Sequence, residues 1–157
     1  MRKFTEHYDK IFVDIDNTLV HGFMTDVMHI TWRMFHNILL SYFLMSIQQK
    51  FRLYKVNRKL VEMLKPLRAD KTIFLTVRTG CSATNDMIRD IMGSAFKVIA
   101  LASDNGALDK AMTMEDCLTG DPHRMLLIDD SKENRDTAEM FGFSTFDPTL
   151  LLEKVIG

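Results

Sequence analysis

Cysteine, proline and glycine are scarce in this chain of 157 residues, which holds 2, 3 and 7 of them. The two cysteines, Cys81 and Cys117, make neither a disulfide framework nor a paired-cysteine metal site, so we expect reduced thiols and a cytoplasmic protein. The few glycines and prolines, with 46% hydrophobic and 26% charged residues, are typical of a globular domain. The length suits one domain that carries a small insertion.

Long uninterrupted apolar segments are also missing. The first ten residues lack the apolar stretch of a signal peptide, so we expect no export. A membrane span needs about 20 apolar residues. Val27–Ile47 has that length, but His29, Arg33 and His36 interrupt it. We predict a buried or oligomer-facing helix here, and a helix on a membrane surface is the alternative.

Acidic residues are absent from Val27 to Val61, where six basic residues occur. These six are Arg33, Lys50, Arg52, Lys55, Arg58 and Lys59. Because the net charge of the whole chain is −1, the remainder carries the opposite sign, −7. A basic module beside an acidic body indicates an anionic ligand or surface, and a solvated helix face is the alternative.

The most informative motif is a pair of carboxylates, Asp14 and Asp16, that follows an apolar run. The run, Ile11–Val13, has the composition of a buried strand, and the turn residues Asn17 and Thr18 come after the pair. Residues two apart on a strand point the same way, so the two carboxylates project together if the strand continues. Close carboxylates repel unless a cation or a proton lies between them. The motif predicts a metal site or an acid–base pair, with a polar loop as the alternative.

Strand-like and helix-like segments alternate along most of the chain. We expect strands at Ile11–Ile15, Thr72–Val77, Val98–Leu101, Met125–Ile128 and Phe143–Phe146, and helices at Cys81–Met92, Leu108–Leu118 and Ser131–Phe141. This order predicts an α/β fold with a parallel sheet of about five strands between helical layers, a Rossmann-like three-layer αβα arrangement.

The interval between the first two expected strands breaks this alternation. Residues 22–66 contain no convincing strand and are predicted to form two helices, roughly Met24–Gln49 and Leu53–Lys65, the second ended by Pro66. We therefore assign residues 1–19 and 71–157 to the sheet-containing core. Residues 20–70 form a small helical insertion.

Polar residues follow three of the predicted strands. The first is followed by Asp14 and Asp16, the second ends at Thr76, and the fourth is followed by Asp129 and Asp130. In a parallel sheet, ligands bind beyond the carboxyl ends of the strands. Several hard oxygen ligands at one edge suit Mg²⁺.

These elements resemble the haloacid dehalogenase (HAD) superfamily of phosphohydrolases along nearly the whole chain. That family has Asp-x-Asp-x-Thr after the first strand, Thr or Ser after the second, then a lysine, then paired acids after the fourth. This chain has Asp14-Ile15-Asp16-Asn17-Thr18, Thr76, a lysine and Asp129-Asp130. The resemblance implies a Mg²⁺-dependent phosphatase, because the dehalogenase branch lacks an acid at the position of Asp16.

The resemblance also implies a role for each motif residue. Asp14 would be the nucleophile that forms an aspartyl-phosphate, and Asp16 the general acid and base. Asp14, the backbone carbonyl of Asp16 and Asp129 would hold Mg²⁺, with Asp130 as a further ligand or partner. Thr76 would donate to the transferring phosphoryl group, whose charge the metal and the lysine would neutralise.

The lysine has three candidates. Lys97 opens the third strand and would lie at its far end, whereas Lys110 begins a helix beyond that strand, so we choose Lys110. Lys132 is the outside candidate. Among neighbouring residues, Arg78 either reaches the substrate phosphate or makes a surface ion pair, and Thr18 either orients Asp16 or caps a turn.

The insertion leaves several functions open. The family places a helical cap here that closes over the site, while a dimer interface is the alternative for so small and apolar a pair of helices. A phosphotransferase or phosphomutase would use the same site residues. A non-catalytic protein that binds a partner or a membrane surface would use Tyr42–Lys59. We expect a small phosphorylated substrate and no nucleic-acid partner.

Overall fold

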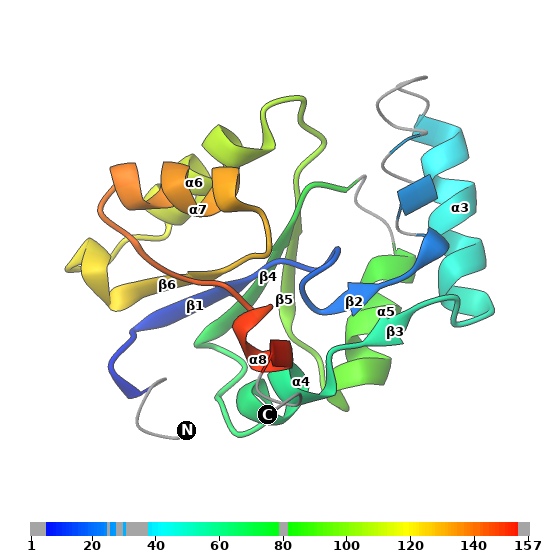
Figure 1. Cartoon of the computed structure of the whole chain (residues 1–157), viewed down its shortest axis with the longest axis horizontal. Helices are drawn as coiled ribbons and strands as arrows, with labels where there is room; N and C mark the ends of the chain where they lie inside the picture. The colour runs from blue at the N-terminus through cyan, green and yellow to red at the C-terminus, as the bar shows by residue number, and fades with distance from the viewer. Residues whose placement is uncertain (1–5, 25, 28–29, 31–37, 79–81, 154–157) are drawn as a thin grey trace.

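A five-stranded parallel sheet forms the centre of the molecule (Figure 1). The computed structural model describes residues 6–24, 26–27, 30, 38–78 and 82–153. The strand order is β5-β4-β1-β6-β7. The strands are β1 (Lys10–Val13), β4 (Thr72–Thr76), β5 (Lys97–Ala100), β6 (Met125–Ile128) and β7 (Ser144–Phe146). The predicted α/β, Rossmann-like fold with five parallel strands is confirmed.

Helices cover both faces of this sheet (Figure 1). They are α4 (Arg58–Leu64), α5 (Ser82–Met92), α6 (Gly106–Asp116), α7 (Lys132–Met140) and α8 (Leu150–Glu153), with a 3₁₀ turn, η1, at Pro122–Arg124. Side chains alternate along β1 between two buried clusters. Ile11 and Val13 pack with Leu60 and Ile88 of α4 and α5, whereas Phe12 packs with Met114 of α6. This alternation gives the three layers.

A two-stranded antiparallel ribbon joins the insertion to the core. Its strands are β2 (Val20–His21) and β3 (Lys55–Val56). The prediction that residues 22–66 hold no strand is therefore wrong, as is a helix beginning at Leu53. The N–H of Asn57 donates to the carbonyl of Leu19 (2.8 Å), and its side chain accepts from the N–H of Leu60 (3.1 Å). Because Asn57 caps α4, the helix begins only at Arg58.

The insertion also contains α3 (Ile38–Lys50), which packs against α5. On this helix Met45 is buried, while Leu39 and Phe43 are 80% and 60% exposed. The first half of the helix predicted at Met24–Gln49 lies largely outside the described residues. No helix in the described part of the chain has both the length and the apolar character needed to cross a bilayer. The boundaries of the insertion and its use as cap or dimer interface stay predictions.

Candidate active site

The predicted site residues of three strands meet at one edge of the sheet. Strands β4, β1 and β6 are neighbours, and Val13 lies opposite both Phe74 and Ile128. The N–H of Asp14 donates to the carbonyl of Ile128 (2.9 Å), which places Asp14 beside Asp129. The sheet register therefore brings together residues that lie more than a hundred positions apart in the chain.

Lys110 bridges the acids of β1 and β6. Its Nζ lies 2.6 Å from Oδ1 of Asp14 and 2.7 Å from Oδ2 of Asp129, and its side chain is 2% exposed. Gly106 brings α6 close to the end of β4, since a Cβ at Gly106 would lie 2.6 Å from Cγ2 of Val77. The first turns of α6 can thus deliver the lysine to this edge.

The two other lysine candidates lie elsewhere. Lys97 is exposed at the amino end of β5, away from the edge that holds Asp14. Lys132 is exposed and pairs with Asp136 one helical turn further along α7. The structure thus brings Lys110 into the acid cluster and leaves Lys97 and Lys132 outside it.

Three carboxylates form a group that can hold a cation. Oxygen atoms of Asp14, Asp129 and Asp130 all lie within 4.8 Å of one another. Thr18 Oγ1 donates to Oδ1 of Asp130 (3.0 Å) and accepts from the N–H of Asp130 (2.9 Å). The hydroxyl of Thr18 therefore holds Asp130 rather than Asp16. Converging carboxylate oxygens are the donors that Mg²⁺ prefers, so this group fits the predicted metal.

Residues of α7 hold the loop that carries Asp129 and Asp130. Asn134 Nδ2 donates to Oδ2 of Asp129 (2.9 Å), and Arg135 donates to the backbone carbonyls of Asp129 (2.7 Å) and Asp130 (2.8 Å). Arg135 also pairs with Asp147 (2.8 Å). The sequence analysis missed Asn134 and Arg135. Their place in the first turns of the helix that follows the paired acids is the signal that could have found them.

Asp16 lies in the loop that follows β1. Residue Asn17 has a left-handed φ of 59°, a conformation that asparagine tolerates, and it lies in the turn between Asp16 and β2. Strand β1 ends at Val13, before both residues, so the strand geometry on which the joint projection of Asp14 and Asp16 is conditional does not extend to them. The joint projection itself stays a prediction. The carboxylate of Asp16 is not part of the three-acid group. Metal binding through its backbone carbonyl stays a prediction.

A buried arginine holds the carboxylate of Asp16. Arg78 donates from Nε to Oδ2 of Asp16 (2.6 Å) and from a terminal nitrogen to Oδ1. The same terminal nitrogen donates to Oε1 of Gln48 in α3 (3.3 Å). Arg78 is only 5% exposed at its side chain, so the alternative of a surface ion pair is wrong. Gln48 is a further contact of the site that the sequence analysis missed.

Thr76 ends β4 beside these groups. Its Oγ1 is buried and has no hydrogen-bond partner among the described residues. Leaving a buried hydroxyl unpaired costs about 1–3 kcal/mol, so such a group in a folded protein calls for an explanation. A ligand oxygen at the carboxyl edge of the sheet would supply the missing partner.

Burial dominates the electrostatics of the acid cluster. It raises the pKa of Asp14 well above its usual range; Lys110 opposes this shift, and the charges of Asp129 and Asp16 add to it. Burial also raises the pKa of Asp130, against the hydrogen bond from Thr18. For Lys110, burial acts to lower the pKa, but the charges of Asp14 and Asp129 outweigh it and raise the pKa. The lysine therefore stays charged, and a cation beside the two acids would favour their ionised form.

Comparison with known proteins gives a match in structure but not in sequence. No protein-family model matches this sequence, and no curated protein matches it. A HAD-family enzyme of Bacteroides thetaiotaomicron, in its magnesium complex, superposes with a TM-score of 0.52 at 16% identity, over 90% of this chain and 93% of that one. The chain has the fold of the haloacid dehalogenase family. A mutant of the same enzyme, in complex with magnesium and inorganic phosphate, gives 0.51 at 12% identity over 89% and 93%.

A second HAD-like protein supports this assignment of the fold. It is a haloacid dehalogenase-like hydrolase of Streptococcus pneumoniae, with a TM-score of 0.53 at 15% identity, over 90% of this chain and 85% of that one. These likenesses cover 89–90% of this chain. The HAD fold expected from the motifs is confirmed.

Proposed function

We propose that this chain is a Mg²⁺-dependent phosphohydrolase that cleaves a small phosphomonoester through an aspartyl-phosphate on Asp14. The observation that carries the proposal is the buried bridge from Asp14 through Lys110 to Asp129, beside the unpaired hydroxyl of Thr76. The solved relatives in fold whose structures hold magnesium and inorganic phosphate support it. A cytoplasmic location is part of the same proposal.

The acid cluster would hold the metal. Carboxylate oxygens of Asp14, Asp129 and Asp130 would coordinate Mg²⁺, together with the backbone carbonyl of Asp16. When bound, Mg²⁺ supplies positive charge that offsets the charge of the acids and of the phosphoryl oxygens. Lys110 adds a second positive charge at Asp14, and Arg135 keeps the loop of Asp129 in place.

The protein groups then divide the reaction into two steps. In the first, a carboxylate oxygen of Asp14 forms a bond to phosphorus while the bond to the leaving oxygen breaks, and Asp16 gives that oxygen a proton. In the second, Asp16 takes a proton from a water molecule, whose oxygen attacks phosphorus and releases Asp14. Thr76 would donate to a phosphoryl oxygen throughout.

Arg78 contributes to the proposed reaction through its hydrogen bonds to Asp16. Both carboxylate oxygens of Asp16 accept from Arg78, and these two hydrogen bonds fix the orientation of the carboxylate. We propose that Arg78 positions Asp16. It would reach the substrate phosphate, the role expected from the sequence, only after it has released Asp16.

Phosphate release from a panel of phosphomonoesters tests the proposal. With Mg²⁺, we expect Asp14→Asn to lower kcat on the order of 10⁴-fold or more, as removal of a nucleophile does. The control is Asp136→Asn, which neutralises an exposed acid of α7 and should leave the rate unchanged. Rapid acid quench with mass spectrometry should find phosphate on the peptide that contains Asp14. Undiminished release by Asp14→Asn would show that Asp14 is not the nucleophile.

A further inference from the structure

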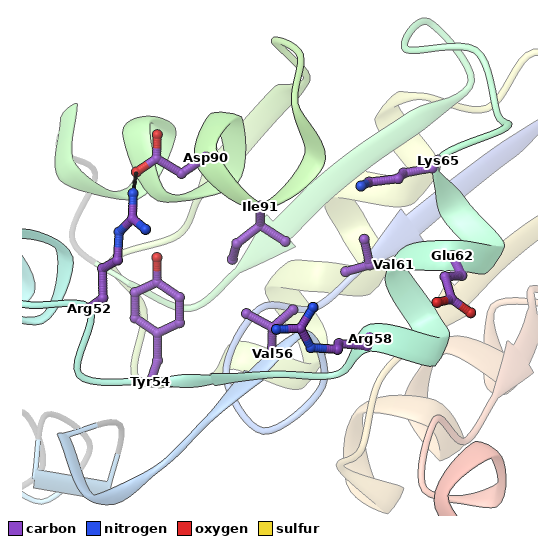
Figure 2. A pocket seen from close by; sticks show the side chains of 9 residues that line it. All are labelled: Arg52, Tyr54, Val56, Arg58, Val61, Glu62, Lys65, Asp90 and Ile91. Carbon is purple, nitrogen blue, oxygen red and sulfur yellow. Dashed lines mark ion pairs between the residues drawn. The ribbon is translucent and has the colours of Figure 1, made fainter.

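A hollow lies on the insertion side of the molecule (Figure 2). It has a volume of about 400 Å³ and is bounded by β3, α4, the last turn of α5 and the chain around Tyr54. Pockets for small molecules fall in the range of about 300–1,000 Å³. None of its lining residues belongs to the proposed active site, and we call it the α4 groove.

The floor of the α4 groove is apolar. Val56, Val61 and Ile91 line it, and all three pack on the larger hydrophobic cluster of the core. Val61 is buried, while Val56 and Ile91 are partly exposed. The ring of Tyr54 stands beside Val56, as Figure 2 shows. A ligand with an apolar body could therefore cover side chains that water now contacts.

Two cations at the ends of α4 reach into this groove, Arg58 as its first residue and Lys65 directly after its last. Arg58 and Lys65 are seven residues apart, two helical turns, and their side chains extend from α4 toward Val56 and Ile91 (Figure 2). Within the described part of the chain, neither side chain makes an ion pair or a hydrogen bond. These two cations are thus available to a ligand.

The other charges at the groove do not cancel this pair. Asp90 already faces Arg52 at 4.0 Å and accepts from Gln49 (2.9 Å). Glu62 lines the groove but makes no ion pair with a described residue. Positive charge thus exceeds negative charge along α4. This observation gives part of the basic segment, noted in the sequence, a definite place in the structure.

We propose that the α4 groove binds a small organic anion, a function beyond the phosphohydrolase reaction. The acidic group of the ligand pairs with Arg58 and Lys65, which have no ion-pair or hydrogen-bond partner among the described residues. Its apolar body lies on the floor formed by Val56, Val61 and Ile91. The ligand class is a carboxylate, sulfonate or phosphate attached to an aromatic or aliphatic group.

A pair of matched dyes tests this proposal on the full chain, with ¹⁵N amide spectra as the readout. The anionic probe is 8-anilinonaphthalene-1-sulfonate, and the neutral probe is N-phenyl-1-naphthylamine, which lacks the sulfonate. We expect the anionic dye to shift the amides of Val56, Val61 and Ile91 in a saturable manner. The double variant Arg58→Gln/Lys65→Gln should weaken that binding roughly tenfold or more, because it removes two charged partners.

A second double variant controls for net charge. Arg68→Gln/Lys132→Gln removes one arginine and one lysine that are exposed and outside the groove, and it should change the affinity by less than about twofold. The neutral dye should bind both variants as it binds the unmodified chain. Equal weakening by the two double variants would overturn the proposal. So would anionic-dye shifts confined to the exposed face of α3, at Leu39 and Phe43.

Discussion

Two buried cationic side chains pair with the two carboxylates that follow β1. Each of the two cations has its further contact in a different part of the molecule. Lys110 joins Asp14 to Asp129, and all three residues belong to the five-stranded core. Arg78 joins Asp16 to Gln48, and Gln48 lies on α3 of the insertion. The proposed nucleophile is therefore held by the core alone, whereas the proposed acid–base group is held partly by the insertion.

Different contacts therefore position the carboxylates of Asp14 and Asp16. The bridge through Lys110 follows from the sheet, since β1 and β6 are paired and α6 packs on α7. The contact between Arg78 and Gln48 depends on the packing of α3 against α5, where Met45 meets Thr84 and Gln49 meets Asp90. A shift of the insertion would thus change the position of Asp16 but not that of Asp14. On this basis we expect the insertion to influence proton transfer more than nucleophilic attack.

Removing Lys110 should give the largest effect. Lys110→Met leaves Asp14 and Asp129 buried without their cation, and breaking a buried ion pair in this way costs about 3–5 kcal/mol. We expect the free energy of unfolding, measured with urea in EDTA, to fall by that amount. We also expect kcat for phosphate release to fall at least roughly 10²-fold.

The control for Lys110→Met is Lys97→Met, which removes the exposed lysine at the far end of β5 and should change neither quantity. Saturating Mg²⁺ should restore part of the lost stability, because it supplies positive charge to the same acids. A Lys110→Met protein as stable as the unmodified chain in EDTA would contradict the buried bridge.

Replacing Arg78 by lysine should have a smaller and more selective effect than removing Lys110. In Arg78→Lys, a single ammonium replaces a guanidinium that meets both oxygens of Asp16. We expect kcat to fall on the order of 10-fold to 10²-fold for substrates with a poor leaving group, as for loss of general acid catalysis. For a nitrophenyl ester, whose leaving group needs no proton, the loss should be smaller.

This dependence on the leaving group separates positioning of Asp16 from phosphate binding. If Arg78 mainly bound phosphate, the two kinds of substrate would lose activity equally. Arg68→Lys, which alters an exposed arginine paired with Asp70, is the matched control and should leave both rates unchanged.

The acid cluster also makes stability depend on pH. Burial raises the pKa of Asp14 above its ordinary value of 3.8. At pH values between 3.8 and the raised pKa, the folded chain therefore binds more protons than the unfolded chain. The contribution of Asp14 to the free energy of unfolding therefore falls as pH rises through this window, by about 1.4 kcal/mol for each unit of the shift.

Urea unfolding in EDTA from about pH 5 to about pH 8 checks this sign. The unmodified chain should lose stability relative to Asp14→Asn as pH rises, since the variant has no carboxyl group to ionise. Lys110 adds no slope in this range, because its raised pKa keeps it charged throughout. Parallel curves for the two proteins would show that the pKa of Asp14 is not raised.

The sequence predicts the part of the site that lies at the carboxyl edge of the sheet. Strands β1, β4, β5 and β6 of the core carry apolar runs, and parallel strands place the residues that follow them at one edge. That reasoning was enough to bring Asp14, Thr76 and Asp129 together. It also chose Lys110 over Lys97, because the two lysines stand at opposite ends of β5.

The half that involves the insertion was not predictable in this way. Strands β2 and β3 have two residues each, too short to show an alternating pattern. Strand β1 ends at Val13, so the conformation of the loop that carries Asp16 does not follow from strand geometry. The contact between Arg78 and Gln48 spans thirty positions in the chain and depends on packing of α3 that no local motif encodes.

The smallest expected effect comes from the link between Arg78 and the insertion. Gln48→Leu keeps the size of the side chain but removes the acceptor for Arg78, so the free energy of unfolding should fall by only about 1 kcal/mol. Loss of activity should be a few-fold and should show the same dependence on the leaving group as Arg78→Lys. Gln49→Leu is the control. Gln49 is the next residue along α3, and its side-chain amide donates to Asp90 at the surface and not to Arg78. If the two leucine variants behave alike, α3 does not act on Asp16 through Gln48, and both carboxylates of the β1 loop are controlled by the core.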